Sequence, residues 1–196
     1  MEQSSFTYII IIMIAVVLIK IYIEADFFQL KCVISNKDGN TYCVRERKKM
    51  NQAVDLLREV NGKMKYMVNY MYETYPDKKC CQRLKEGFNP KKINETLPTS
   101  EYTAYSENKG EKLAFCLHRR KNGTKLIDIN TLTFVALHEL SHIMTESVGH
   151  TDEFWNNFKF LLKNAVKEKI YSPVDYKKNP QSYCGMSITD NPYYDM

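Results

Sequence analysis

The chain has 196 residues, of which 44% are hydrophobic, 12% aromatic and 26% charged, and its net charge is +5. This composition excludes a disordered chain, and the mean hydropathy of −0.44 excludes a polytopic membrane protein. The length suits one domain with an appendage.

The first feature along the chain is an apolar run near the N-terminus. Residues 9–19 carry no polar side chain, and the run extends past Lys20 to Ile23. As a helix, residues 6–23 would be about 27 Å long, which is enough to span the hydrocarbon core of a bilayer. A cleaved signal peptide fits less well, because no Lys or Arg precedes the run.

These observations predict a short tail at residues 1–5, one transmembrane helix at 6–23 in contact with membrane lipid, and a connector at 24–46. The protein would then be a single-pass protein of a host or virion membrane. The lysines that follow the run favour a cytosolic body. The sequons at Asn94 and Asn122 could be glycosylated only on the lumenal side, so the side stays open. The six cysteines permit disulfides without requiring them.

The body, residues 47–196, contains both helical and strand patterns. Residues 47–75 predict a long helix with a methionine-rich core face. Residues 77–99 predict an irregular connection, whose lysines are interleaved with acids and therefore do not indicate a nucleic-acid partner. Residues 102–106 and 112–117 predict two strands joined by a turn, and Asn130 or Thr131 would cap the next helix. The isolated His118 is expected to lie on a strand and to be structural.

The chemistry is concentrated where three of the four histidines fall within thirteen residues. His138, Glu139 and His142 form an H-E-x-x-H pattern. On a helix, histidines four residues apart project from the same face and can bind one metal ion. Glu139 could then act as the general base toward water at the open coordination position. The pattern predicts a catalytic site with one Zn²⁺ ion.

A third ligand is predicted just beyond this helix. Gly149 permits a turn that would return His150 toward the other two histidines, and a catalytic zinc site usually has three protein ligands. Thr151 is the expected N-cap of an amphipathic helix with Glu153 in its first turn. That helix would pack beneath the site and hold His150 in place.

These residues resemble the WLM and SprT-like group of zinc metallopeptidases. The similarity rests on His138-Glu139-Leu140-Ser141-His142 and on Gly149-His150-Thr151-Asp152-Glu153-Phe154-Trp155, and extends more loosely over residues 102–191. The resemblance implies an α+β, zincin-like fold in which an active-site helix lies beside a small antiparallel sheet. It implies His138, His142 and His150 as zinc ligands, Glu139 as general base, and hydrolysis of peptide bonds. Similar proteins with an N-terminal apolar segment occur in large DNA viruses.

The resulting hypothesis is a membrane-anchored zinc endopeptidase acting on protein or peptide substrates. An extended substrate could pair with the strand around Phe115, and Tyr183 or Glu153 could support the site or its oxyanion. Two alternatives stay open: a zinc-binding structural protein of a membrane or virion without turnover, and a protease of DNA–protein crosslinks. The sequence does not indicate an oligomeric state.

Overall fold

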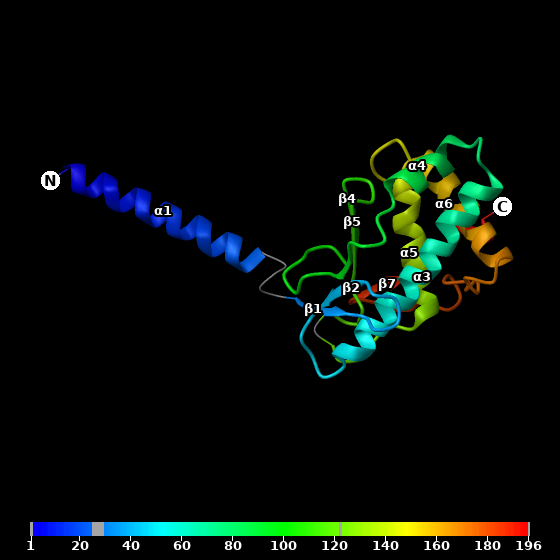
Figure 1. The fold of residues 1–196 in the computed structure, drawn as a ribbon, viewed down its shortest axis with the longest axis horizontal. Coiled ribbons are helices and arrows are strands. Elements are labelled where there is room, and N and C mark those ends of the chain that lie inside the picture. Colours follow the sequence, from blue (N-terminus) through cyan, green and yellow to red (C-terminus); the bar gives the residue numbers. More distant parts are fainter. Residues whose placement is uncertain (1, 25–29, 122, 196) are drawn as a thin grey trace.

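The computed structural model describes residues 2–24, 30–121 and 123–195 (Figure 1), so the sequon at Asn122 lies outside the described residues. Its helices are α1 (Glu2–Glu24), α3 (Met50–Thr74), α4 (Lys79–Gly87), α5 (Ile129–Met144) and α6 (Asp152–Lys167), with a short 3-10 turn η1 (Pro192–Tyr194). Its strands are β1 (Lys31–Ile34), β2 (Thr41–Val44), β3 (Ile93–Glu95), β4 (Ala104–Glu107), β5 (Lys112–Phe115), β6 (Gln181–Tyr183) and β7 (Met186–Ile188).

The predicted α+β class is confirmed, but the sheet is mixed rather than antiparallel. Five strands lie in the order β1-β2-β3-β5-β4. The outer pairs β1/β2 and β4/β5 are antiparallel hairpins, whereas β3 runs parallel to both β2 and β5. The region expected to be a connector, residues 24–46, therefore supplies β1 and β2 to the sheet.

Helix α3 packs along the sheet and against α5 and supplies much of the core (Figure 1). Its apolar residues recur at three- and four-residue steps, which places them on one face of the helix. The methionines on this face are fully buried, as the core interpretation predicted. The buried apolar positions of α3 are Ala53, Val54, Leu57, Val60, Met64, Met67, Val68 and Met71.

The prediction that residues 77–99 form an irregular connection is wrong. They contain α4 and β3, both short. In α4 only Cys81 and Leu84 are buried, and in β3 only Ile93 and Glu95 are. Each of these short elements therefore has only two buried positions. So few buried residues, in a segment rich in lysine, leave almost no helix or strand periodicity in the sequence. The packing that selects these conformations comes from α3, α5 and β5, outside the segment.

The edge of the sheet lies one strand further out than the sequence suggested. Phe115 is fully buried on β5, which is paired on both sides, with β3 and with β4. Strand β5 therefore cannot accept a further strand, and the prediction of substrate pairing at Phe115 is wrong. The edge strand next to β5 is β4, and β1 is the edge strand on the other side of the sheet.

A buried polar cluster joins the two halves of the sheet. Arg45 and Glu95 form an ion pair of 3.4 Å, and His118 Nδ1 lies 3.3 Å from the same Glu95 carboxylate. Arg45 also donates to the carbonyl oxygens of Thr96 and Leu97. These contacts assign His118 a structural environment, in agreement with its expected role.

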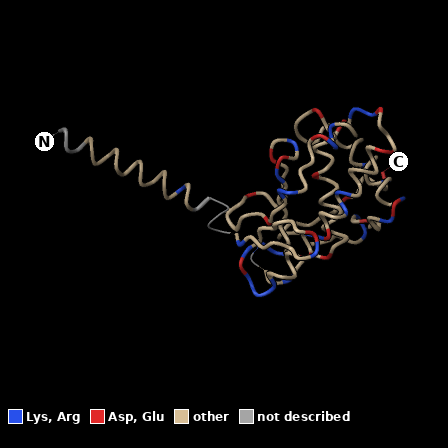
Figure 2. The backbone as a smooth tube through the Cα atoms, in the orientation of Figure 1, with Lys and Arg blue, Asp and Glu red and all other residues tan. Residues whose placement is uncertain are grey.

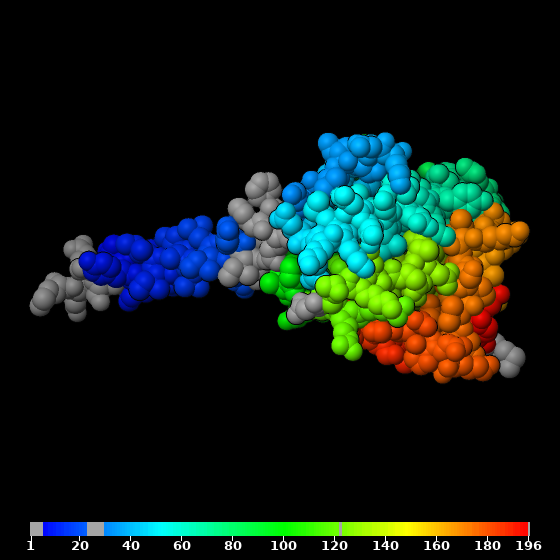
Figure 3. Space-filling model, turned by 90° about the horizontal axis from the view of Figure 1, so that it is seen from below, coloured from blue at the N-terminus to red at the C-terminus, as the bar shows by residue number. Residues whose placement is uncertain are grey.

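Four of the cysteines are paired in two disulfides, a point the sequence left open. Cys32–Cys43 links β1 to β2, and Cys116–Cys184 ties the end of β5 to the β6–β7 hairpin across 68 residues of sequence. In Figure 3 this C-terminal region, orange to red, packs against the yellow-green chain that leads into α5. The turn is held there because Cys184 N–H donates to the His118 carbonyl at 3.0 Å.

The transmembrane anchor predicted at residues 6–23, with its lipid contact and the assignment as a single-pass membrane protein, is wrong. Across the described ranges, no helix combines the length and apolarity needed to cross a membrane. A spanning helix needs about 20 consecutive, mainly apolar residues. The uninterrupted apolar run of α1 covers only residues 9–19 and ends at Lys20.

Charge on the remaining structure is interspersed. Figure 2 shows blue Lys and Arg positions and red Asp and Glu positions both scattered along the backbone of the body. Most ion pairs on it are exposed, such as Lys92–Glu111 at 3.0 Å with both side chains more than half exposed. Exposed pairs of this kind contribute little to stability, so the core and the disulfides hold the fold.

We expect the two disulfides to contribute unequally to stability. Loop-closure entropy grows as (3/2)RT ln n, so separations of 68 and 11 residues give Cys116–Cys184 about 1.6 kcal/mol more stabilisation than Cys32–Cys43. Urea unfolding of the Cys116→Ser/Cys184→Ser and Cys32→Ser/Cys43→Ser variants measures the difference. Equal losses for the two pairs would contradict this expectation.

Candidate metal centre

Helix α5 carries the first two candidate ligands. It begins after Asp128, whose carboxylate accepts from the Thr131 backbone N–H at 2.9 Å and from the Thr131 hydroxyl at 2.8 Å. The N-cap is therefore Asp128 and not the expected Asn130 or Thr131, which lie inside the first turn of the helix. The two carboxylate oxygens of Asp128 accept both of these hydrogen bonds. The helix then runs to Met144, so His138 and His142 lie on one face of its last two turns.

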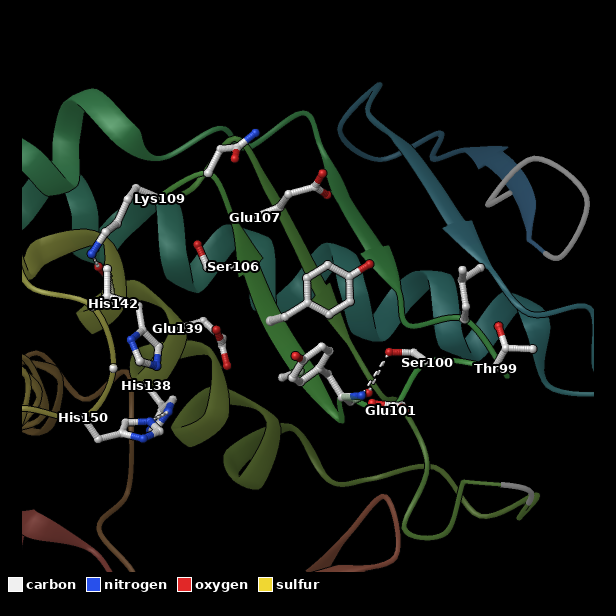
Figure 4. Close-up of a pocket in the computed structure, with 17 residues that line it drawn as sticks. Thr99, Ser100, Glu101, Ser106, Glu107, Lys109, His138, Glu139, His142 and His150 are labelled. Atoms are coloured by element: carbon white, nitrogen blue, oxygen red, sulfur yellow. Dashed lines mark hydrogen bonds between the residues drawn. The ribbon is translucent and has the colours of Figure 1, made fainter. Parts of the chain in front are cut away.

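The three histidines of the motif converge. His138 Nε2 and His150 Nε2 are 3.0 Å apart, and one ring nitrogen from each of His138, His142 and His150 lies within 4.8 Å of the others. Figure 4 shows the three imidazoles directed toward a common point, with Glu139 beside them facing the open pocket. This cluster could hold a metal ion.

Aromatic side chains from α6 support the imidazoles. Phe154 lies against the His142 ring with centroids 4.3 Å apart, and Phe158 contacts His138 edge-on at 5.2 Å. Trp155 stacks on His150 at 5.6 Å. Phe154 and Phe158 are buried, so α6 presents a fixed apolar floor to the ligands. This is the packing role that the sequence predicted for the helix.

The environment of His138 and His142 keeps these two imidazoles neutral. Burial, and next the neighbouring His142 and His150, lower the pKa of His138 to about 3. Burial, followed by His150 and Lys109, lowers the pKa of His142 to about 4. Since a metal ion binds the unprotonated ring nitrogen, these shifts favour metal binding at neutral pH.

Glu139 has the opposite shift. Its side chain is buried, and this burial raises the pKa of the carboxyl to about 8. A carboxyl group with a pKa near neutrality can both accept and release a proton at physiological pH. A cation bound beside it would stabilise the charged form and lower this pKa.

A groove of about 1040 Å³ opens from the histidines. One wall is the α5 segment with His138, Glu139 and His142, continued by residues 148–150, and the other is strand β4 and the turn after it. Its far end is lined by Leu97, Thr99, Ser100, Glu101 and Tyr102. The groove therefore places a sheet edge opposite the candidate metal ligands (Figure 4).

Tyr183 and Glu153, which were predicted to support the site or its oxyanion, both lie outside the histidine cluster. Tyr183 is buried, and its hydroxyl donates to the Thr103 carbonyl at 3.1 Å. Burial and then the Glu139 carboxylate raise the Tyr183 pKa well above its ordinary value. Tyr183 therefore lies behind the site rather than in the groove lining.

Glu153 contacts the loop that leads to His150 instead of the histidines. Its carboxylate accepts from the backbone N–H groups of Glu146 at 3.0 Å and Ser147 at 3.2 Å. These two bonds are the main reason that the pKa of Glu153 is lowered. Glu153 thus holds the loop in position.

Sequence reasoning missed Lys109 and Arg83. The Lys109 ammonium donates to the carbonyls of Thr145 and Ser147 at 2.8 and 2.9 Å, and Arg83 Nε donates to the Met144 carbonyl at 2.9 Å. Both come from elements remote in sequence, so no local pattern marks them. The sequence indicates only that Asn108-Lys109-Gly110 forms a turn, and in the structure all three of these residues have positive φ.

Relatives of this chain are viral proteins. It is 31% identical over 196 residues to the uncharacterized protein R325 of Acanthamoeba polyphaga mimivirus, covering 94% of this chain and 98% of the relative, and it belongs to the same family. It is 33% identical over 75 residues to protein 136R of invertebrate iridescent virus 6, covering 38% of this chain and 41% of that protein. Protein 042R of invertebrate iridescent virus 3 is 34% identical over 99 residues, covering 50% and 57%.

No family profile matches the chain. Among solved structures, the chain is similar to Wss1 from Saccharomyces cerevisiae, with a TM-score of 0.48 and 16% identity over 65% of this chain and 88% of that one. A likeness of this size does not bear on function.

We expect one zinc ion per chain, because the three imidazoles form a single cluster. Replacing His142 or His150 by Ala should weaken zinc binding more than about 100-fold, since loss of even an outer partner of a ligand costs 10–100-fold. Competition with a chromophoric chelator measures this affinity. His118→Gln is the matched control: it alters the remaining histidine and should leave stoichiometry and affinity unchanged. Equal loss in the control would show that the cluster is not the site.

Proposed function

We propose that the chain is a zinc-dependent endopeptidase. The observation that carries the proposal is the convergence of three imidazoles with the buried Glu139 carboxyl at the wall of a groove bordered by a sheet edge. The fold would then be zincin-like, with α5 as the active-site helix. His138, His142 and His150 would be the ligands and Glu139 the general base.

The donor set fits zinc. At catalytic sites Zn²⁺ is held by three protein ligands, which can all be histidine nitrogens, and keeps one position for water or substrate. Two nitrogens bound to one tetrahedral ion at 2.0–2.1 Å lie roughly 3.3 Å apart. The nitrogens here lie within 4.8 Å of one another, the closest pair at 3.0 Å, so side-chain rotations are enough to reach that spacing.

When bound, zinc would supply Lewis acidity toward a carbonyl oxygen and increase the acidity of a water molecule. Glu139 supplies the proton transfer. Its carboxyl lines the groove next to His138 and His142 and is buried enough to hold a proton near neutral pH. It would accept the proton of the attacking water and deliver it to the nitrogen of the leaving amine.

Strand β4 is the element that would bind the peptide substrate. It pairs with β5 on one side only, with Tyr105 opposite Ala114 and Glu107 opposite Lys112. The Cys116 N–H bonds to the Thr103 carbonyl, so residues 103, 105 and 107 direct their main-chain groups toward β5. Ala104 and Ser106 direct theirs outward into the groove, where an extended peptide could add as a further strand.

Glu139→Gln should retain zinc and lose at least about 100-fold in kcat/KM. The amide keeps the size of the side chain but cannot accept the proton, and general acid–base catalysis contributes roughly 10²–10⁴-fold. A fluorogenic peptide library with zinc-loaded protein measures cleavage. Undiminished cleavage by the variant would contradict the role of Glu139. A zinc-loaded wild-type chain that cleaves nothing would favour the structural alternative.

Substrate pairing along β4 can be tested at one N–H group. Ser106→Pro removes the outward donor, and an edge strand tolerates proline. We expect KM to rise about tenfold, equivalent to one net hydrogen bond of about 1.4 kcal/mol, while zinc affinity stays constant. Ser106→Ala is the matched control because it keeps the N–H group and should behave as the unmodified chain. An unchanged KM in Ser106→Pro would exclude β4 as the docking edge.

A second candidate, a protease of DNA–protein crosslinks, is favoured by one surface feature. Arg47 donates to the carbonyls of Lys121 and Gly123, which brings the basic segments 45–49 and 119–125 together. Lys48, Lys49, Arg120 and Lys125 are exposed there. Phosphate contacts by such cations are salt-dependent. Cleavage that rises with single-stranded DNA and falls in a Lys48→Glu/Arg120→Glu variant would select this candidate. DNA-independent cleavage would select a general endopeptidase.

A further inference from the structure

The third candidate ligand depends on a loop that has no secondary structure of its own. Seven residues separate His142 from His150, and α5 ends after Met144. His150 itself is exposed and follows Gly149, whose φ is +86°. A loop of this length could adopt many conformations, yet only a few would place His150 Nε2 beside His138.

Contacts from three separate elements fix this loop, residues 145–149. From α6, the Glu153 carboxylate accepts the N–H groups of Glu146 and Ser147 and also the Ser147 hydroxyl at 2.9 Å. From α4, Arg83 donates to the Met144 carbonyl and to Glu153 Oε1 at 3.0 Å. Together these bonds hold the N–H groups and the carbonyl at the point where the chain leaves α5.

The third element is the turn between β4 and β5. Its Lys109 ammonium lies over the C-terminus of α5 and donates to the Thr145 and Ser147 carbonyls. Figure 4 shows Lys109 reaching from the hairpin toward the backbone beside His142. A cation is favourable at this end of a helix, where the carbonyl oxygens are unpaired. Lys109 therefore joins the groove wall that carries β4 to the loop that carries His150.

Close packing also fixes the backbone segments that carry Arg83 and Lys109. A Cβ atom on Gly87, at the end of α4, would lie 2.6 Å from the Lys109 carbonyl oxygen and 2.7 Å from Ile143 Cγ2. A Cβ on Gly110 would lie 2.5 Å from the Gly87 carbonyl oxygen. The end of α4, the β4–β5 turn and α5 thus meet with no room for a side chain, next to His142.

We propose that Arg83, Lys109 and Glu153 are positioning residues that hold the 145–149 loop so that His150 is preorganised as the third ligand. None of the three side chains contacts an imidazole nitrogen in the hydrogen bonds of the described residues. They act through the loop backbone. The proposal rests on the proposed zinc site and assigns it a means of holding a ligand that is remote in sequence.

The test measures zinc affinity and its coupling to His150. Arg83→Met and Lys109→Met, on two different elements, should each weaken zinc binding about 10–100-fold, as loss of outer-sphere support does. In a His150→Ala background the same changes should have no further effect, because the ligand they position is absent. The absorption spectrum of the Co²⁺-loaded variants should show loss of one nitrogen ligand.

Glu146→Gln is the matched control. Its side chain belongs to the same network but makes only an ion pair with Arg83 at 82% exposure, so zinc affinity should not change. Thermal unfolding of the metal-free variants shows whether weaker zinc binding results from loss of folding instead of loss of loop positioning. If Arg83→Met does not fold, Lys109→Met tests the proposal. Zinc binding as tight as in the unmodified chain, or equal losses with and without His150, would overturn the proposal. Failure of the unmodified chain to bind zinc would instead overturn the proposed function.

Discussion

The packing of α6 against α5 is the interaction on which the candidate site depends. Phe158 contacts Phe134 at 5.3 Å and His138 at 5.2 Å, while Phe154 contacts all three histidines. A buried aromatic side chain removes about 150–250 Å² of surface from water. The hydrophobic effect that joins the two helices therefore also sets the orientation of the imidazoles. Core packing thus orients the imidazole rings, while polar contacts hold the loop that leads to His150.

This arrangement explains the unusual electrostatics of the site. The aromatic floor covers His138, and Glu139 is also buried, so desolvation disfavours the charged form of each side chain. The result is that His138 and His142 are neutral and lie beside a carboxyl that can hold a proton. Without a cation, such a group of buried polar side chains costs stability. With one, the same desolvation strengthens every interaction within the site.

The sequence was sufficient where local patterns carry the information. The α3 stripe, the Thr151 cap, whose hydroxyl accepts the Phe154 N–H, and the histidine spacing on α5 all depend on residues close in the chain. It was insufficient for α4 and β3, because each has few buried apolar residues and is stabilised by packing against α3 and against α5 or β5. It was also insufficient for Lys109, because the turn that brings it to α5 is set by tertiary contacts at Gly87 and Gly110. The apolar run of α1 satisfied a composition rule without meeting the requirement for a spanning helix.

The C-terminal hairpin β6–β7 supports the wall of the groove that contains β4. The Thr103 carbonyl, just before β4, accepts both the Cys116 N–H at 2.8 Å and the Tyr183 hydroxyl at 3.1 Å. Cys116 is disulfide-bonded to Cys184, the residue next to Tyr183. Two hydrogen bonds thus fix the start of the edge strand, a disulfide joins one of the two donor residues to the neighbour of the other, and Tyr183 is close enough to Glu139 to interact with it electrostatically. Tyr183, considered from sequence as an oxyanion donor, is better explained as a support that fixes β4 relative to Glu139, the proposed general base.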